Sequence, residues 1–214
     1  MVATPSVESD LNARGFKNSL VHWSRGVNPD FYYPRDKAFI SLPRPISMFV
    51  GRVAIEKNIG AFLSLDIPGT KIVVGDGPQM KELKAKFPDT VFVGFLSGEP
   101  LAKYMAAADV LVFPSRTDTF GIVLLDALAS GIPVAAFPVT GPLDVITSDK
   151  VGKLDENLKK AITEALKLDA DDCRNYALNY SWANCTEQFF NNLVPVFEEI
   201  KQRQSNSVAE HFVR

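Results

Sequence analysis

Short apolar runs alternate with amphipathic stretches along most of the chain. Five runs rich in β-branched or aromatic residues begin 25, 20, 19 and 24 residues apart: ISMFV (46–50), KIVV (71–74), VFVGF (91–95), VLVF (110–113) and VAAF (134–137). Each interval has room for a strand of about five residues, a crossover helix and two short loops. The runs show no apolar–polar alternation, so we expect strands that are buried on both faces, as in a parallel sheet.

The stretches between these runs carry apolar residues at helical spacing, with charges on the opposite side. They include NIGAFLSL (58–65), PQMKELKAKF (78–87) and EPLAKYMAAAD (99–109). Parallel strands that are joined by right-handed crossovers place such helices on both faces of the sheet. The pattern therefore predicts an α/β fold with a doubly wound, Rossmann-like parallel sheet.

The two ends of the chain follow other patterns. SLVHW (19–23) is interpreted as a strand, and the Pro-rich aromatic passage after it is typical of an ordered linker. After residue 153 the pattern is helical, and Ser181 is a suitable N-cap for the last helix. The predicted organisation is a linker region (1–40), a sheet domain with C-terminal helices (41–200) and a tail (201–214).

Composition narrows the class of partner. The 214 residues are 46% hydrophobic and 22% charged, and 23 basic against 25 acidic residues give a net charge of −2. These are the values of a globular protein, without the positive field that attracts nucleic acid, so nucleic acid is not an expected partner. Cys173 and Cys185 have no Cys-x-x-Cys spacing, so neither a disulfide framework nor a zinc site is indicated, and we expect two small, half-buried apolar residues in a reducing compartment.

The sequence also bears on location. No segment approaches the ~18 apolar residues of a membrane span. The N-terminal MVATPSVESD has neither the basic flank nor the apolar core of a signal peptide. We therefore expect a cytoplasmic protein without a transmembrane segment.

Glycine-rich or polar turns follow four of the predicted strands. In an open α/β sheet, ligands bind outside the carboxyl ends of the strands. The turns are GRVAIEKN (51–58), GDGP (75–78), PSRTDTFG (114–121) and PVTGP (138–142). The ligand site is therefore expected at this edge of the sheet.

Several of these features have ordinary structural interpretations. GDGP by itself is a common turn, and Arg52 and Lys57 taken singly are more often solvated than bound to a ligand. Asp169, Asp171 and Asp172 lie between two predicted helices, where acidic residues commonly cap, so no metal site is expected. No nucleophile accompanies the two histidines, His22 and His211, so a hydrolase triad is not supported.

The turns together favour an anionic ligand that also carries hydroxyls. A helix that starts near residues 119–121 would direct the free amides of Phe120, Gly121 and Ile122 at a phosphate. Arg52 and Lys57 would neutralise the same diphosphate.

The two carboxylates of this region need other partners. At ~6 Å and an effective dielectric of ~20, Asp118 and a phosphate would repel by nearly 3 kcal/mol, so Asp118 should meet neutral hydroxyls. Asp126 lies further along the helix and could hold a ribose diol. Without such a ligand, Asp126 should pair with a cation or face solvent. The expected ligand thus consists of a sugar, a diphosphate and a ribose.

At this point the sequence resembles a known family. Its GRVAIEKN (51–58), GDGP (75–78), AADVLVFPS (107–115) and DTFGIVLLDALASGIPV (118–134) are similar to the motifs of family 4 (group 1) retaining glycosyltransferases. The chain looks like the C-terminal, donor-binding half of their two-lobed GT-B fold. The resemblance implies catalytic roles for Arg52, Lys57 and Asp118. It implies donor binding by Gly51, Gly75, Gly77, Thr119, Phe120, Gly121, Ile122, Val123 and Asp126.

The sequence departs from the family pattern in two ways. Asp118 and Asp126 stand where the family usually has Glu, and each loses a methylene, or ~1.5 Å of reach. Residues 1–35 resemble only the last element of the N-terminal half and the connection between the halves. The resemblance thus marks residues 1–40 as a remnant of that half, and neither the acceptor site nor the family's catalytic-site His of that half has a counterpart.

We therefore expect hexosyl transfer from a UDP- or GDP-sugar donor, without a cofactor or a required metal, and the resemblance implies that the transfer proceeds with retention. The acceptor would be a sugar or a lipid, with an N-terminal half acting in trans and a location at the periphery of the inner membrane. The alternatives are a non-catalytic nucleotide-sugar-binding module or half of a split enzyme, a nucleotide-sugar epimerase, and a domain for another phosphate ligand. The base, the sugar, the acceptor and the oligomeric state stay open.

Overall fold

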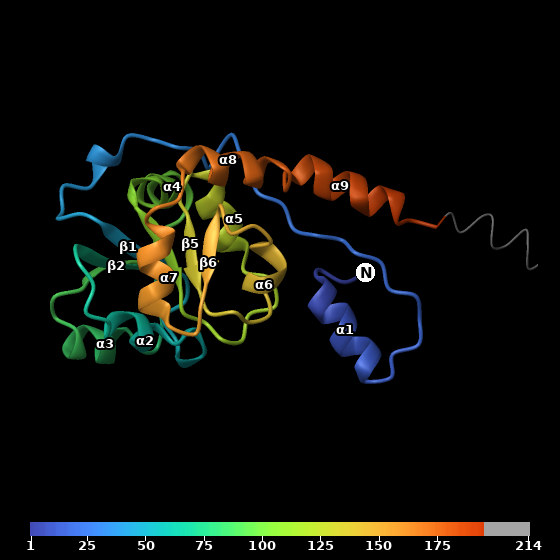
Figure 1. The fold of residues 1–214 in the computed structure, drawn as a ribbon, viewed down its shortest axis with the longest axis horizontal. Coiled ribbons are helices and arrows are strands. Elements are labelled where there is room, and N and C mark those ends of the chain that lie inside the picture. Colours follow the sequence, from blue (N-terminus) through green and yellow to red (C-terminus); the bar gives the residue numbers. More distant parts are fainter. Residues whose placement is uncertain (195–214) are drawn as a thin grey trace, which may run out of the picture.

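The computed structural model describes residues 1–194, whose centre is one six-stranded parallel sheet (Figure 1). The strand order is β3-β2-β1-β4-β5-β6. The strands are β1 (Ile46–Val50), β2 (Thr70–Val74), β3 (Val91–Gly94), β4 (Val110–Phe113), β5 (Val134–Ala136) and β6 (Gly152–Leu154). The five predicted strands are confirmed with ends that differ by at most one residue, and the predicted α/β fold with a parallel sheet is confirmed.

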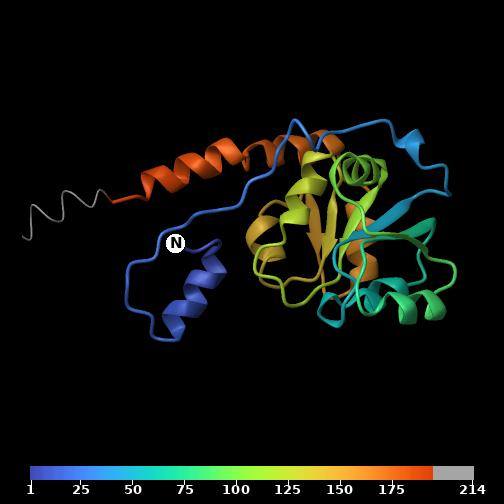
Figure 2. The same cartoon turned by 180° about the vertical axis from the view of Figure 1, so that it is seen from behind.

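Helices cover both faces of the sheet, as Figures 1 and 2 show from opposite sides. Buried residues of α4 (Gly98–Ala107), α5 (Ile122–Ala129) and α8 (Ala170–Leu178) belong to one apolar cluster. Those of α2 (Ile59–Leu63), α3 (Met80–Lys86) and α7 (Leu158–Ala165) belong to a second one. The sheet is therefore doubly wound, as the helical spacing between the strands predicts.

The strands contribute side chains to both clusters, which explains why their sequences do not alternate. Met48 points into the first cluster and Phe49 into the second, and both are buried. All four residues of β4 are buried as well. An apolar residue is therefore needed at successive positions, as in other sheets with two covered faces.

The strand order reverses between β1 and β4. On one side, β1 pairs with β2 over five positions, from Ile46 opposite Thr70 onward. On the other side, its register with β4 contains only two pairs, Ser47 with Val110 and Met48 with Leu111. The loops after these two strands therefore diverge at the topological switch point, where ligands bind in open α/β sheets.

The prediction of a strand at 19–23 is wrong. His22 makes a single parallel bridge with Val2, and no strand among residues 1–194 pairs with the segment. An extended segment without a paired neighbour has no ladder of hydrogen bonds to stabilise it. The preceding residues form α1 (Pro5–Ala13), which the pattern did not predict, although Thr4 caps it and Pro5 occupies its first turn.

The strand β6 and the short helix α6 (Pro142–Val145) were also missed. β6 has only three residues, Gly-Lys-Leu, at the edge of the sheet, so it shows no apolar run. It is identified as a strand only because it pairs with β5. Short edge strands that carry a lysine are common because they discourage further pairing.

The helical C-terminal part is confirmed within the described residues. α7, α8 and α9 (Trp182–Asn191) follow one another, and the hydroxyl of Ser181 caps α9 by accepting from the Asn184 amide. The end of the last predicted helix, the tail 201–214 and His211 lie outside the described residues.

Residues 22–27 lie alongside α9, and this part of the molecule projects from the sheet domain (Figures 1 and 2). The Asn192 side chain donates to the His22 carbonyl at 2.7 Å. The ring of Trp23 lies 5.0 Å from that of Phe189. The N-terminal segment is thus held by the C-terminal helix, a long-range contact without a local sequence pattern.

A second long-range contact fixes the linker passage to the sheet domain. The Arg174 guanidinium on α8 donates to the backbone carbonyls of Tyr32 at 2.6 Å, Pro29 at 2.8 Å and Ala129 at 2.8 Å. These bonds join the linker, the end of α5 and α8. The passage after residue 26 is therefore an ordered part of the molecule, in agreement with its interpretation as an ordered linker.

Candidate functional site

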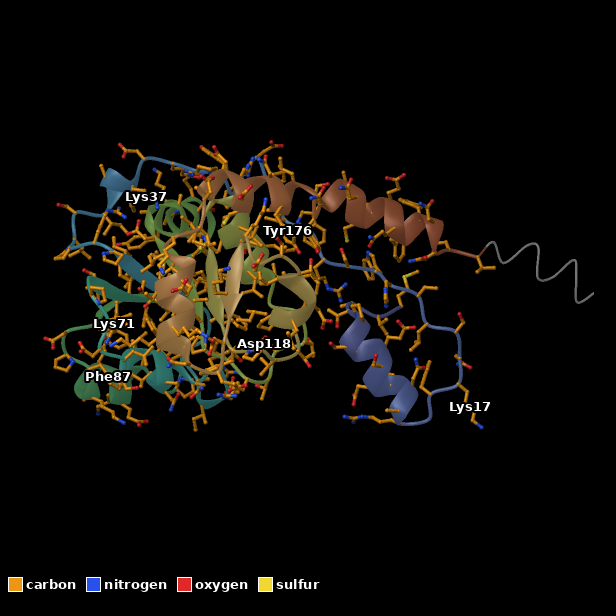
Figure 3. All side chains as sticks on the ribbon, in the orientation of Figure 1. Lys17, Lys37, Lys71, Phe87, Asp118 and Tyr176 are labelled. Atoms are coloured by element: carbon orange, nitrogen blue, oxygen red, sulfur yellow. The ribbon has the colours of Figure 1, made fainter. Side chains whose placement is uncertain are left out.

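The candidate site lies where the loops after β1, β2 and β4 meet. Asp118, in the loop after β4, lies at the opposite end of the sheet from Lys37 (Figure 3). Lys37 binds Asp109, which immediately precedes β4. Asp118 is therefore at the carboxyl edge, where the sequence predicts the ligand site.

The loop after β1 makes two sharp changes of direction. A 3-10 turn, Ile55–Lys57, is followed by Asn58, whose φ of 52° and ψ of 33° are left-handed. α2 then begins at Ile59, which is fully buried. The turn therefore separates Lys57, which pairs with Asp118, from the helix that anchors the loop in the core.

Side chains join this loop to the loop after β4. The amide Nδ2 of Asn58 donates to the Pro114 carbonyl at 3.1 Å. The hydroxyls of Ser115 and Thr117 both lie within reach of the Glu56 carbonyl, at 3.3 and 3.4 Å. Among the described residues, no backbone hydrogen bond joins residues 51–58 to residues 114–121. The relative position of the two loops therefore depends on these side chains.

The ammonium of Lys57 and the carboxylate of Asp118 form an ion pair across the two loops. Nζ lies 2.6 Å from Oδ2, and the side chains are only 24% and 20% exposed. From the sequence alone, Lys57 was expected to neutralise phosphates and Asp118 to meet hydroxyls. In this structure, Lys57 is the group that compensates the charge of Asp118.

The loop after β2 lies against the loop after β1 so closely that only glycine fits. A Cβ atom on Gly75 would lie 1.8 Å from the Gly51 carbonyl oxygen. The Gly51 amide donates to the Val74 carbonyl at 3.0 Å, and the Gly75 amide donates to the Gly94 carbonyl at 2.8 Å. A Cβ on Gly77 would lie 2.4 Å from the Val53 carbonyl. Gly75 and Gly77 are thus explained by backbone packing around the site.

A cavity of about 390 Å³ opens beside these glycines. Its lining is mostly apolar and consists of Val50, Gly51, Arg52, Val74, Gly75, Asp76, Phe95, Leu96 and Leu101. The side chain of Phe95 is 73% exposed at this cavity. The Arg52 side chain is 68% exposed and lies 4.0 Å from Glu56. Its guanidinium is thus only loosely held at the rim.

The helix α5 starts at the same edge. It begins at Ile122, just after the predicted range 119–121, and Gly121 precedes it with a φ of 80° that favours glycine. Within residues 1–194, the amides of Phe120, Gly121, Ile122 and Val123 have no hydrogen-bond partner. The Phe120 side chain is buried and anchors this turn. Four free donors therefore lie at the positive end of the α5 dipole.

Asp126 lies one turn further along α5. Within the described residues its carboxylate has neither an ion pair nor a hydrogen bond, and burial raises its pKa to about 7. Burial raises the pKa of the Tyr32 hydroxyl to about 12, and the negative charge of the nearby Asp126 carboxylate adds to this shift. Asp126 thus does not pair with a cation within the described residues, and its side chain is partly exposed. It is a half-buried carboxyl group without a protein partner in this part of the chain.

The loop after β5 supports the loop that carries Asp118. A Cβ on Gly141 would lie 3.0 Å from the Asp118 carbonyl and 3.3 Å from the Phe120 carbonyl. The hydroxyl of Ser6 at the start of α1 donates to Asp144 of α6 at 2.9 Å. The fourth predicted turn (138–142) therefore contacts the site through its backbone.

Sequence reasoning missed three residues that matter here: Asn58, Ser115 and Tyr32. Asn58 had a detectable signal, since asparagine is, after glycine, among the residues that most readily adopt a left-handed conformation. Ser115 is buried and Tyr32 lies near Asp126, and both placements result from tertiary contacts.

The other candidate groups are explained locally. Asp169 caps α8 by accepting from the Asp171 and Asp172 amides, as expected for an interhelical aspartate. His22 binds Glu8 at 2.6 Å on the surface. Within residues 1–194 no group of three His, Cys, Asp or Glu could hold a metal ion. The described part of the chain also contains no helix that is long and apolar enough to cross a membrane.

The chain is similar to known proteins in sequence and in structure. A family model described as "Glycosyl transferases group 1" matches residues 44–168, which include the loops after β1, β2, β4 and β5. The sulfoquinovosyl transferase SQD2 of Arabidopsis thaliana is 34% identical over 168 residues, which are 72% of this chain and 33% of that protein. A GDP-mannose-dependent alpha-mannosyltransferase of Mycobacterium tuberculosis is 37% identical over 161 residues, which are 71% of this chain and 42% of that protein.

The chain therefore spans about a third to two fifths of the length of these curated relatives. Among solved structures, Anabaena HepE in complex with UDP and glucose superposes with a TM-score of 0.72 and 16% identity. The match covers 90% of this chain and 62% of that one. At this identity the superposition supports the fold alone.

Proposed function

Because the chain belongs to the group 1 glycosyl transferases, we propose that it supplies the donor-binding half of a retaining glycosyltransferase. The donor would be a UDP- or GDP-sugar, since one relative is named as GDP-mannose-dependent and one structural neighbour was solved with UDP. The activity of the whole relatives is proposed here only for a molecule that also contains an acceptor-binding half.

The observation that carries this proposal is the set of unpartnered amides at the start of α5. The amides of residues 120–123 have no partner within the described residues, and the helix dipole adds positive potential at the same point. Such a helix end binds phosphate. Lys57 lies beside it through its contact with Asp118, so a diphosphate placed there would meet both donors and a cation.

The two carboxylates would then hold the ends of the donor. Asp118 would accept from hydroxyls of the sugar, and Asp126 from those of the ribose. A half-buried carboxyl group that loses water without gaining a partner costs free energy, and ligand hydroxyls would satisfy it. This explains why Asp126 lacks a partner in the described residues.

The apolar cavity beside Gly51 and Gly75 would take the nucleobase. Its volume of about 390 Å³ accommodates a planar base, and the exposed ring of Phe95 offers an apolar surface against which the base could pack. Arg52 at the rim would reach toward the diphosphate. The ligand would thus extend from this cavity past the start of α5 to Asp118.

In the transfer step, these residues would stabilise the charge that develops on the departing diphosphate. The amides of residues 120–123 are fixed by the helix and need little reorganisation, whereas Lys57 and Arg52 add charge. Asp118 would orient the sugar. No metal is required in this proposal, because the cations and the amides neutralise the diphosphate.

The second candidate function is a non-catalytic nucleotide-sugar-binding module or one half of a split enzyme. A cytoplasmic location, attachment to the inner membrane, and a sugar or lipid acceptor are further predictions. Transfer or donor hydrolysis by this chain, alone or with an acceptor-binding half added, would exclude the non-catalytic module.

Isothermal titration with UDP, GDP and ADP tests the donor site. We expect micromolar binding of one nucleotide that is lost in the Asp126→Ala variant. The matched control is Asp149→Ala, which removes an exposed carboxylate whose only ion pair in the described part of the chain is with Lys153. Absence of binding by all three nucleotides would contradict the proposal.

A further inference from the structure

Asn58 occupies an unusual position between Lys57 and the helix α2. Among residues 1–194 it is the one non-glycine residue with a positive φ. It ends the 3-10 turn Ile55–Lys57 and directly precedes α2. The left-handed conformation therefore falls at the residue that follows the site lysine.

This conformation lets one short segment serve two purposes. Ile59 and Phe62 of α2 are fully buried in the core, whereas Lys57 reaches Asp118 in another loop. The left-handed residue changes the direction of the chain between Lys57 and the buried helix.

The side chain of Asn58 also joins the two loops of the site. Its Nδ2 donates to the Pro114 carbonyl at 3.1 Å. This bond is shorter than the contacts of Ser115 and Thr117 with Glu56, and the described residues provide no backbone bond between the loops. Backbone turn and side-chain bond together set the distance from the loop of Lys57 to that of Asp118.

We propose that Asn58 is a positioning residue that holds the ammonium of Lys57 where the donor diphosphate meets it. Asn58 itself touches no reacting atom in this proposal. The role rests on the proposed function, because it assumes that Lys57 binds the diphosphate. The contact of Lys57 with the diphosphate would thus depend on the bond from Asn58 to the Pro114 carbonyl, which joins the loops after β1 and β4.

The Asn58→Gly variant separates the side-chain bond from the backbone conformation. Glycine adopts a positive φ readily, so the turn is retained while the bond to Pro114 is lost. We expect the affinity for the nucleotide diphosphate to fall at least fivefold, measured by titration calorimetry. In the Lys57→Ala background, the same substitution should change affinity less than twofold, because the lysine through which Asn58 acts is absent.

The matched control is Asn179→Gly. Asn179 also donates its Nδ2 to a backbone carbonyl, that of Tyr176 at 3.2 Å, but it ends α8, whose end is outside the loops of the site. Its substitution removes the same type of bond and should change nucleotide affinity less than twofold. Equal binding by Asn58→Gly and the parent protein would overturn the proposal. So would additive effects of Asn58→Gly and Lys57→Ala.

A second measurement is independent of ligand. Thermal unfolding of Lys57→Met, Asp118→Asn and the double variant gives the coupling between the two charged residues. The coupling, expressed as a shift in Tm, should fall by at least half when the cycle is repeated with Asn58→Gly. An unchanged coupling would overturn the positioning role.

The two measurements distinguish the possible failures. If the parent protein binds no nucleotide diphosphate, the proposed function is wrong, and the unfolding cycle still decides whether Asn58 positions Lys57. If the parent protein binds a nucleotide and the coupling is unaffected by Asn58→Gly, only the role of Asn58 is wrong.

Discussion

The ammonium of Lys57 lies 2.6 Å from the carboxylate of Asp118, and this contact joins the loops after the two strands where the strand order reverses. Both side chains are more than three quarters buried. An anionic ligand that enters between these loops would attract the lysine and repel the aspartate. The ion pair therefore influences the affinity of the site for phosphate.

The Asp118→Asn variant should bind a free nucleotide diphosphate more tightly. The variant removes one negative charge close to the phosphates and releases Lys57. This should make the free energy of binding more favourable by about 1 kcal/mol, which is roughly a fivefold lower Kd. Transfer of the sugar should fall by roughly 100-fold or more, because the contact with the sugar hydroxyls is weakened.

Titration calorimetry with the preferred nucleotide, and a transfer assay with the acceptor-binding half present, measure these two effects. Asp149→Asn removes a carboxylate that is 90% exposed and serves as the control. Weaker nucleotide binding by Asp118→Asn would contradict this account and would mean that Asp118 chiefly orients Lys57 for the ligand.

Asp126 should make stability depend on pH. Burial raises its pKa from the usual 3.8 to about 7 in the folded state. Between these values the folded protein holds the proton and the unfolded chain does not, so the number of protons bound is larger in the folded state. The resulting contribution to the free energy of unfolding is complete below about pH 4 and is lost as pH rises toward 7.

The Asp126→Asn variant, which resembles the protonated form, lacks this dependence. It should be more stable than the parent protein at pH 7.5 by roughly 1–3 kcal/mol, and the difference should shrink toward pH 4. Urea unfolding at several pH values measures this. A difference that is constant with pH would show that Asp126 keeps an ordinary pKa.

Gly75→Ala should disrupt both stability and binding. Its Cβ would lie 1.8 Å from the Gly51 carbonyl oxygen, so the backbone of one loop must move. We expect a loss of roughly 2 kcal/mol or more in the free energy of unfolding, together with weaker nucleotide binding.

Gly60→Ala is the matched control for this substitution. A Cβ on Gly60 would meet nothing within 4 Å, and the residue lies inside α2. Because alanine favours helix over glycine, this variant should gain about 0.5–1 kcal/mol. Unfolding in urea compares the two variants, and equal behaviour would refute the close approach of the two loops.

Arg174→Met should loosen the linker passage. The guanidinium donates to three backbone carbonyls, of Pro29, Tyr32 and Ala129, and methionine replaces none of these bonds. We expect a loss of roughly 2–3 kcal/mol and faster proteolytic cleavage within residues 28–40.

Arg14→Met is the control for the loss of a guanidinium. Arg14, the C-cap of α1, is 74% exposed and pairs with Asp10 of that helix, so the cost should be below about 0.5 kcal/mol. Limited proteolysis and urea unfolding test both variants. Equal cleavage of residues 28–40 in the two variants would contradict the role assigned to Arg174.

Local sequence patterns predicted an element correctly where its successive residues share the same kind of surroundings. The runs 46–50 and 110–113 are apolar at successive positions because both faces of their strands are covered, and this requirement is visible in the sequence. The order of glycine-rich turns after the strands likewise located the site at one edge of the sheet. The strand β6 and the helix α1 escaped detection because their existence depends on a neighbouring strand and on a cap.

The sequence by itself determined the parallel α/β sheet, the edge that carries the candidate site, and the presence of Arg52, Lys57, Asp118 and the start of α5 at that edge. Only the tertiary structure decided that Lys57 meets Asp118 and that Asp126 has no partner within the described residues. The bond from Asn58 to Pro114 joins residues that are 56 positions apart. Such contacts depend on how two loops approach each other once the strands are paired, and periodicity along the chain carries no information about that distance.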